Sequence, residues 1–298
     1  MYPRRKYRDD PTGIDWQKLE NPVATKKYDG ASFFVPVEAD GSLRFFSRRP
    51  SVKGGFPERT EQLPHLSSRK LPKSHAGTVL NVELIHTGKH HSLPESHRTV
   101  SGILNSLPER SIQTQKDTGP VRAVILDVIN PGIATFKDKL EYMKKVENDF
   151  GKPDLLFSIN PETTKEGILR LIQDSKRKGE EGVIVTSLTQ HEDSNVRVKV
   201  KNFDTFNLRV VKVEQEFDKN GNPKESMGSA VVADASGREV ANVGSGWSRQ
   251  EREYYWKNPY RIIGQLIQVK TMGLGSPGGR LRAPVYNGMA DGQLDRVG

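Results

Sequence analysis

The chain is 298 residues long, carries 46 lysines and arginines against 37 aspartates and glutamates, and contains no cysteine. The absence of cysteine excludes disulfide scaffolds, cysteine-bound zinc, iron–sulfur clusters and thiol nucleophiles, so covalent chemistry must use another side chain. The length predicts two domains, and the formal net charge of +9 favours a polyanionic partner such as nucleic acid.

No segment has the roughly 20 consecutive apolar residues of a membrane span, and the N-terminal segment lacks the apolar core of a signal peptide. We therefore expect a cytoplasmic protein with no membrane partner.

Apolar runs predict strands in the first two thirds of the chain, at residues 32–37, 43–47, 78–85, 121–129, 182–186 and 196–200. Helices are predicted between them, over residues 96–107, after Thr135, and from a capping box of Thr163 and Glu166 to Gly179. Together these elements predict an α+β domain of antiparallel sheets with flanking helices.

After about Asp204 the pattern changes to short strands and tight turns, with a capped helix beginning at Ser248 and Glu251. Interpreted as five short strands with a helix before the last, this segment predicts a small Greek-key barrel of the OB type, a frequent binder of oligonucleotides. We place the domain boundary between residues 205 and 206.

The strongest chemical motif is Lys27-Tyr28-Asp29-Gly30, directly before a predicted strand. A lysine attacks phosphorus only in its deprotonated form, which neighbouring cations and partial burial favour, and an aspartate two residues on can orient it or help to hold a metal. By itself the motif is also typical of a charged turn.

Further charged residues follow in order, at Arg48, Glu83, Asp127, Glu181, Lys199 and Lys201. Alternation along a strand puts Lys199 and Lys201 on one face, where both ammonium groups can reach a single phosphate.

In this order the motifs resemble those of small ATP-dependent DNA ligases of the covalent nucleotidyltransferase superfamily, which also holds RNA ligases and mRNA capping guanylyltransferases. The resemblance runs from about Pro22 to the C-terminus. It implies a nucleotidyltransferase (adenylation) domain over residues 1–205 and a C-terminal OB-fold DNA-binding domain over residues 206–298. The implied protein is a monomer that seals nicks in double-stranded DNA.

The resemblance also implies a role for each site residue. Lys27 attacks the α-phosphorus of ATP and becomes lysyl-AMP; the AMP passes to the 5′-phosphate of a nick, and the 3′-hydroxyl displaces it. ATP contacts are implied for Lys26, Asp29, Gly30, Arg48, Glu83, Leu126, Glu181, Lys199 and Lys201. Mg²⁺ or Mn²⁺ is assigned to Glu181 and Asp29, and DNA contacts are assigned to Arg49, Lys53, Arg280 and Arg282.

Three positions depart from the family pattern. Ser32 stands where an arginine is usual, Leu126 replaces a stacking aromatic residue, and Met289-Ala290-Asp291-Gly292 replaces R-x-D-K. Arg280 or Arg282 is the substitute that we expect for the missing cations. The alternatives are an RNA ligase, a capping-type nucleotidyltransferase, and a catalytically degenerate nick-binding module. The compact layout resembles that of phage or accessory bacterial ligases.

Overall fold

The structure, a computed structural model, describes residues 6–8, 14–52, 54–86, 93–130, 132–189, 198–274 and 279–297. The chain divides into two compact units, Met1–Asn202 and Phe203–Gly298. The boundary expected from the sequence, between residues 205 and 206, lies inside strand β10 (Asp204–Phe217) at the beginning of the second unit.

The larger sheet of the first unit has five strands. Their order is β4 (Phe46–Ser47), β3 (Ala31–Pro36), β5 (Val79–His86), β6 (Val121–Ile129) and β7 (Leu156–Ser158). All neighbours are antiparallel except β6 and β7. Strands β5 and β6 are apolar along most of their length because both faces of the sheet are covered.

A second sheet of the same unit has four strands. Their order is β1 (Lys6–Arg8), β9 (Val198–Lys201), β8 (Gly182–Ser187) and β2 (Pro22–Lys26). Sequence patterning did not predict β2, because Val23 and Ala24 are its only apolar residues apart from a proline. The strand is buried by tertiary packing, since α5 lies against it.

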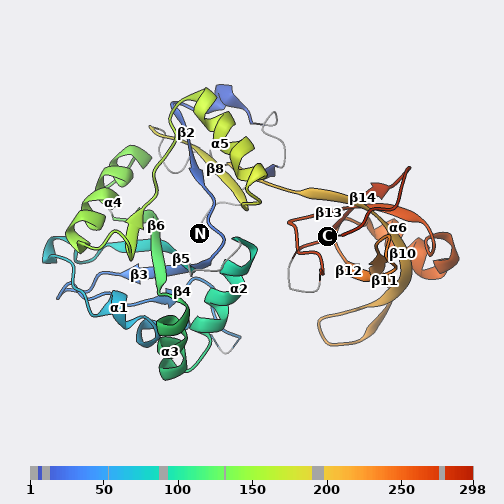
Figure 1. Ribbon diagram of the computed structural model, residues 1–298, viewed down its shortest axis with the longest axis horizontal. Helices are drawn as coiled ribbons and strands as arrows, with labels where there is room; N and C mark the ends of the chain where they lie inside the picture. Colours follow the sequence, from blue (N-terminus) through green and yellow to red (C-terminus); the bar gives the residue numbers. More distant parts are fainter. Residues whose placement is uncertain are drawn as a thin grey trace. The chain divides into compact units, whose positions relative to one another are not determined.

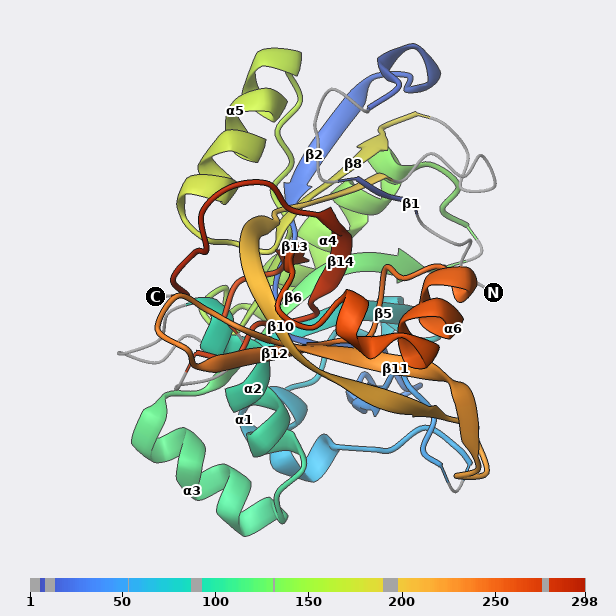
Figure 2. The same ribbon diagram turned by 90° about the vertical axis from the view of Figure 1, so that its right-hand side faces the viewer.

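Helices cover both sheets. They are α1 (Pro64–Ser67), α2 (Leu93–Leu104), α3 (Pro108–Thr118), α4 (Phe136–Phe150) and α5 (Lys165–Arg177). In Figure 1, α5 lies beside β2 and β8, and α4 lies beside β6, which the contacts between these elements support. Figure 2 shows α2 and α3 as two separate helices.

Two helix predictions need correction. The helix expected over residues 96–107 ends at Leu104, and a second helix begins at Pro108, because proline is favoured in a first turn. The cap of α5 is Thr164 and not Thr163, since the Thr164 hydroxyl accepts a hydrogen bond from the Gly167 backbone N–H at 3.0 Å. The helix after Thr135 is confirmed, with Met143 and Phe150 buried.

The described residues of the second unit form an antiparallel sheet of five strands. Their order is β12 (Glu239–Val243), β11 (Pro223–Ala233), β10, β13 (Leu266–Thr271) and β14 (Val285–Met289). Helix α6 (Arg249–Lys257) begins with the predicted capping box of Ser248 and Glu251. Two strands follow this helix instead of the predicted one, because half-exposed β14 has no clear apolar alternation.

The ends of this sheet approach each other at one point. Ser245 and Val285 form a single parallel bridge, and the Tyr286 N–H donates to the Ser245 carbonyl at 2.9 Å. Within residues 203–274 and 279–297 no continuous ladder joins β12 to β14, so the sheet is not a closed barrel.

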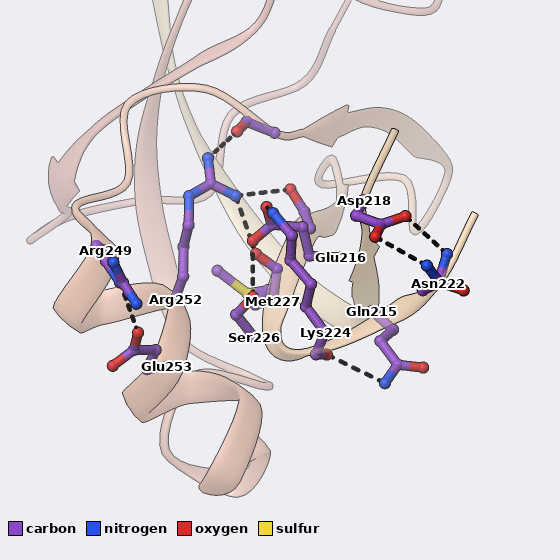
Figure 3. Close-up of polar contacts among 12 residues, drawn as sticks. Gln215, Glu216, Asp218, Asn222, Lys224, Ser226, Met227, Arg249, Arg252 and Glu253 are labelled. Atoms are coloured by element: carbon purple, nitrogen blue, oxygen red, sulfur yellow. Dashed lines mark hydrogen bonds and ion pairs between the residues drawn. The ribbon is translucent and has the colours of Figure 1, made fainter. Parts of the chain in front are cut away.

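Arg252 of α6 ties the helix to this sheet. Its guanidinium donates to the carbonyls of Met227 and Gly228, both at 2.9 Å, and to that of Gly244, as Figure 3 shows. Arg249, one turn earlier, pairs with Glu253 at 2.8 Å on the exposed side. The two arginines of one short helix therefore have different structural roles.

Among the helices of the described segments, none has the length and apolar character needed to cross a membrane.

Candidate functional site

The segment Lys27–Gly30 connects the two sheets of the first unit, since β2 ends at Lys26 and β3 begins at Ala31. The Lys27 N–H donates to the Gly182 carbonyl at 2.9 Å, which joins the segment to the beginning of β8. A Cβ atom at position 30 would lie 2.1 Å from the Leu84 carbonyl oxygen of β5. Glycine is therefore required for this close approach of two backbones.

Glu181 lies between two lysines. Its Oε2 atom contacts Nζ of Lys27, and its Oε1 atom lies 3.5 Å from Nζ of Lys201. The register of the sheet explains the second distance, because Gly182 pairs with Lys201 across β8 and β9. Gly182 has φ of 137°, and a Cβ atom there would lie 2.0 Å from the Val200 carbonyl oxygen. A residue larger than glycine would therefore not fit at position 182, and this close packing against β9 holds the Glu181 carboxylate near the two lysines.

A parallel ion pair lies one residue away. Lys26 Nζ donates to Glu180 Oε1 at 2.6 Å, so two consecutive lysines face two consecutive glutamates. Pairing of β2 with β8 produces this arrangement, since Lys26 is in register with Val183.

Glu83 projects from β5 toward the same segment. Its Oε1 atom accepts a hydrogen bond from the Gly30 N–H at 3.1 Å. Burial raises the pKa of Glu83 to about 7, and the charges of Glu181 and Asp29 add to the rise, whereas Lys27 and the Gly30 hydrogen bond oppose it. Glu83 therefore changes its protonation state near neutral pH.

A cavity of about 180 Å³ opens beside these residues, and we call it the inner cavity. One part of its wall is apolar and includes Leu126, Phe136, Ile159 and Ile184. The polar part includes Lys26, Lys27, Ser32, Arg48, Asn81, Glu83 and Lys199. An apolar slot with converging charged groups is typical of a small-molecule site.

A larger hollow of about 690 Å³, the outer groove, shares Ser32, Arg48, Glu83 and Lys199 with the inner cavity. It adds two further arginines, Arg49 and Arg59, together with His97 of α2. His97 Nδ1 lies 2.8 Å from the Gly30 carbonyl oxygen, so this nitrogen carries the proton and donates. The outer groove is predominantly basic, as an anion site requires.

Most residues predicted from the sequence come together in the first unit. Lys26, Lys27, Arg48, Glu83, Leu126 and Lys199 line the inner cavity; Gly30 and Arg49 line the outer groove; Glu181 and Lys201 join them by ion pairs. Asp29 acts on Glu83 through its charge.

Three predicted residues remain. Lys53 is outside the described residues. Arg280 and Arg282 belong to the second unit, where Arg280 Nη2 donates to Asn242 Oδ1 at 2.6 Å. Within the described segments no group of three or more histidine, aspartate or glutamate side chains is arranged to hold a metal ion.

Sequence reasoning missed Asn81, Arg59 and His97. A signal for Asn81 was present, because it lies two residues before Glu83 on a strand and so shares its face. Arg59 and His97 had none, since only the packing of distant segments brings them to the outer groove.

Comparison of folds identifies similar solved structures. The structure called Pmar-Lig_PreS3 matches with a TM-score of 0.71 and 19% identity over 97% of this chain and 67% of that chain. A second match is a structure described under DNA binding with a minimal scaffold, a structure-function analysis of Lig E DNA ligases. Its TM-score is 0.69 and its identity is 16%, over 96% of this chain and 98% of that chain. Pmar-Lig_Pre matches with a TM-score of 0.65 and 18% identity, over 95% and 66%.

These likenesses show that the chain has the fold of small DNA ligases. It spans about two thirds of the length of the two Pmar-Lig structures and nearly all of the Lig E structure. No family model and no curated protein matches the sequence.

Proposed function

We propose that this protein is an ATP-dependent DNA ligase that seals nicks through a lysyl-AMP intermediate. The observation that carries the proposal is the position of Lys27, which lines the inner cavity while its ammonium group contacts Glu181. The DNA-ligase fold supports the same conclusion.

In the first step the Lys27 ammonium group gives up a proton to solvent and the resulting amine attacks the α-phosphorus of ATP. A P–N bond forms, the P–O bond to the leaving group breaks, and pyrophosphate is released. Glu181 orients the lysine through its Oε2 contact. Lys199 lines the cavity and Lys201 contacts Glu181, so both cations can stabilise the charge that develops on phosphate oxygens. Glu83 and Arg48 are assigned to the ribose side of the nucleotide.

Divalent metal binding fits the oxygen donors of this site. Mg²⁺ takes one or two protein carboxylates and completes its shell with water and phosphate oxygens, so Glu181 and Asp29 suffice without a cluster of three acidic residues. When bound, Mg²⁺ or Mn²⁺ would neutralise phosphate charge.

The outer groove is assigned to the nick. The AMP group passes from Lys27 to a 5′-phosphate, and the 3′-hydroxyl then attacks that phosphate and releases AMP. Arg49, Arg59 and Lys199 line the groove and can bind the DNA phosphates through charge, largely without regard to sequence.

We assign the second unit to an OB-type DNA-binding domain. The order β12-β11-β10-β13-β14 and the Ser245–Val285 bridge between the sheet's ends support the assignment, because an OB barrel closes by pairing such ends. Mutual movement of the two domains during the reaction is expected for this architecture.

The test is covalent labelling with ATP that carries a labelled α-phosphate, in the presence of Mg²⁺. We expect one labelled AMP per chain, an adduct that is lost in acid as a P–N bond is, and transfer of the label to nicked DNA. Lys27→Arg is the sharp variant, because arginine keeps the charge beside Glu181 yet stays protonated and cannot attack. It should give no adduct.

The alternatives give other results. A degenerate nick-binding module would bind nicked DNA without any labelling of the wild type. An RNA ligase would seal nicked RNA and leave nicked DNA open, and a capping-type enzyme would accept GTP. Labelling of Lys27→Arg at the wild-type rate would exclude Lys27 as the nucleophile.

A further inference from the structure

Asn81 presents an unsatisfied polar atom to the inner cavity. Its side chain lines the cavity from β5, the residue is 4% exposed, and its Oδ1 atom has no hydrogen-bond donor among the described residues. Buried polar atoms in proteins nearly always have a partner, and an unmet acceptor destabilises the fold. An unmet acceptor in the wall of a cavity therefore points to a ligand that brings the donor.

The neighbours of Asn81 do not supply that donor. Asp127 lies opposite Asn81 in the adjacent strand, and its carboxylate can only accept. Asp127 Oδ1 is engaged by Lys139 Nζ at 3.0 Å and by the Val128 N–H at 2.9 Å. The acidic neighbour is thus held by its own partners.

The position of Asn81 matches one part of a nucleotide. Glu83 and Asn81 share a strand face and lie roughly 7 Å apart along it, with Glu83 next to the segment that carries Lys27. The apolar wall formed by Leu126 and Phe136 belongs to the same cavity and suits a flat purine ring. With the ribose at Glu83, the base extends toward Asn81.

We propose that Asn81 selects adenine, its Oδ1 atom accepting a hydrogen bond from the 6-amino group of ATP. This inference rests on the proposed ligase function and adds the residue that reads the base. The asparagine amide complements adenine because the amino group donates while the adjacent ring nitrogen accepts. Guanine presents an oxygen where adenine has the amino group, so Asn81 Oδ1 in its present orientation would meet a second acceptor.

The test compares two nucleotides in each of two proteins, as in a double-mutant cycle. ATP is compared with purine riboside triphosphate, which lacks the 6-amino group, in wild type and in Asn81→Leu, where an apolar group of similar size replaces the amide. Rates of covalent labelling are measured, and binding is measured by calorimetry in the Lys27→Ala background, where no adduct can form. Asn148→Leu is the control, since Asn148 is exposed on α4.

We expect wild type to prefer ATP by about tenfold or more, the effect of leaving one buried acceptor unmet. In Asn81→Leu the ratio of ATP to purine riboside triphosphate, in affinity and in labelling rate, should fall close to one, because only the binding of ATP is weakened. An equal loss of affinity for both nucleotides, or an unchanged ratio between them, would overturn the proposal. Asn81 would then have only a structural role in the cavity wall.

The comparison of the two nucleotides in the wild type is by itself a test of the proposal. If it binds the two nucleotides equally, the proposal is wrong whether or not Asn81→Leu folds. The proposed function fails differently, since wild type would then form no adduct with ATP, while the binding cycle in Lys27→Ala would still report on Asn81.

Discussion

The ammonium group of Lys27 contacts the carboxylate of Glu181, an ion pair that joins the end of β2 to the beginning of β8. Glu181 also reaches Lys201, so one carboxylate positions two cations of the site. We expect Glu181→Gln to slow covalent labelling by about 10²-fold, because the amide can accept a hydrogen bond but carries no charge to orient the lysine or bind a metal.

The matched control for this change is Glu180→Gln. Glu180 precedes Glu181 directly but pairs with Lys26, at 2.6 Å, and not with Lys27, the proposed nucleophile. Rapid-quench labelling should show a much smaller effect for the control. Equal effects of the two substitutions would mean that the rate depends on general charge and not on the Lys27 contact.

Glu83 predicts a pH dependence of stability. Its pKa rises from 4.5 to about 7 on folding, chiefly through burial. The folded state therefore retains a proton that the unfolded state loses, and this contribution is complete below pH 4.5 and is lost as the pH rises through 7. Its full size is about 3 kcal/mol.

Glu83→Gln removes this titration while keeping an oxygen for the Gly30 N–H. Urea unfolding at pH 5 and pH 8 should show that the stability of the variant relative to wild type increases at the higher pH. A difference between the proteins that stays constant across this range would refute the assignment.

The close backbone approach at Gly30 limits the size of the side chain at this position. A methyl group there would meet the Leu84 carbonyl oxygen at 2.1 Å, so Gly30→Ala should destabilise the first unit by about 1–3 kcal/mol and reduce labelling. Gly102→Ala is the opposite case, because Gly102 lies in α2 with open space around it and should gain about 0.5–1 kcal/mol. Thermal unfolding of both variants measures the difference in sign.

Arg59 predicts a DNA contact that sequence reasoning had not assigned. Arg59→Ala should weaken binding to nicked DNA and lower the slope of log affinity against log salt by about 1, with ATP labelling unchanged. Arg44→Ala is the control, because Arg44 pairs with Glu58 at 2.7 Å and lines neither hollow. An unchanged salt slope for Arg59→Ala, measured by fluorescence anisotropy, would remove this residue from the DNA site.

Arg252 predicts a structural role in the second unit. Lysine cannot reproduce the fork that reaches the carbonyls of Met227, Gly228 and Gly244, so Arg252→Lys should cost about 1–3 kcal/mol. Arg249→Lys, in the same helix, should leave stability unchanged, since its partner Glu253 is a surface contact. Denaturant unfolding followed by tryptophan fluorescence compares them, and similar losses for both would contradict the distinction.

Local sequence patterns determined much of the fold. The strand alternation at Val198–Lys201 correctly put Lys199 and Lys201 on one face, because a period of two is a property of the extended backbone itself. The capping box at Ser248 was equally local. The strands β2, β7 and β14 were missed because they are short. The burial of β2 and β7 depends on partners far along the chain, and β14 is half-exposed.

The sequence by itself determined the order of the charged motifs and the identity of the candidate nucleophile. Only the tertiary structure decided that Lys27 meets Glu181, that His97 donates to the Gly30 carbonyl, and that Asn81 keeps an unmet acceptor. These contacts depend on sheet register and burial, which join residues far apart in the chain. The order of residues along the chain specifies neither the register of the sheets nor the burial of each side chain.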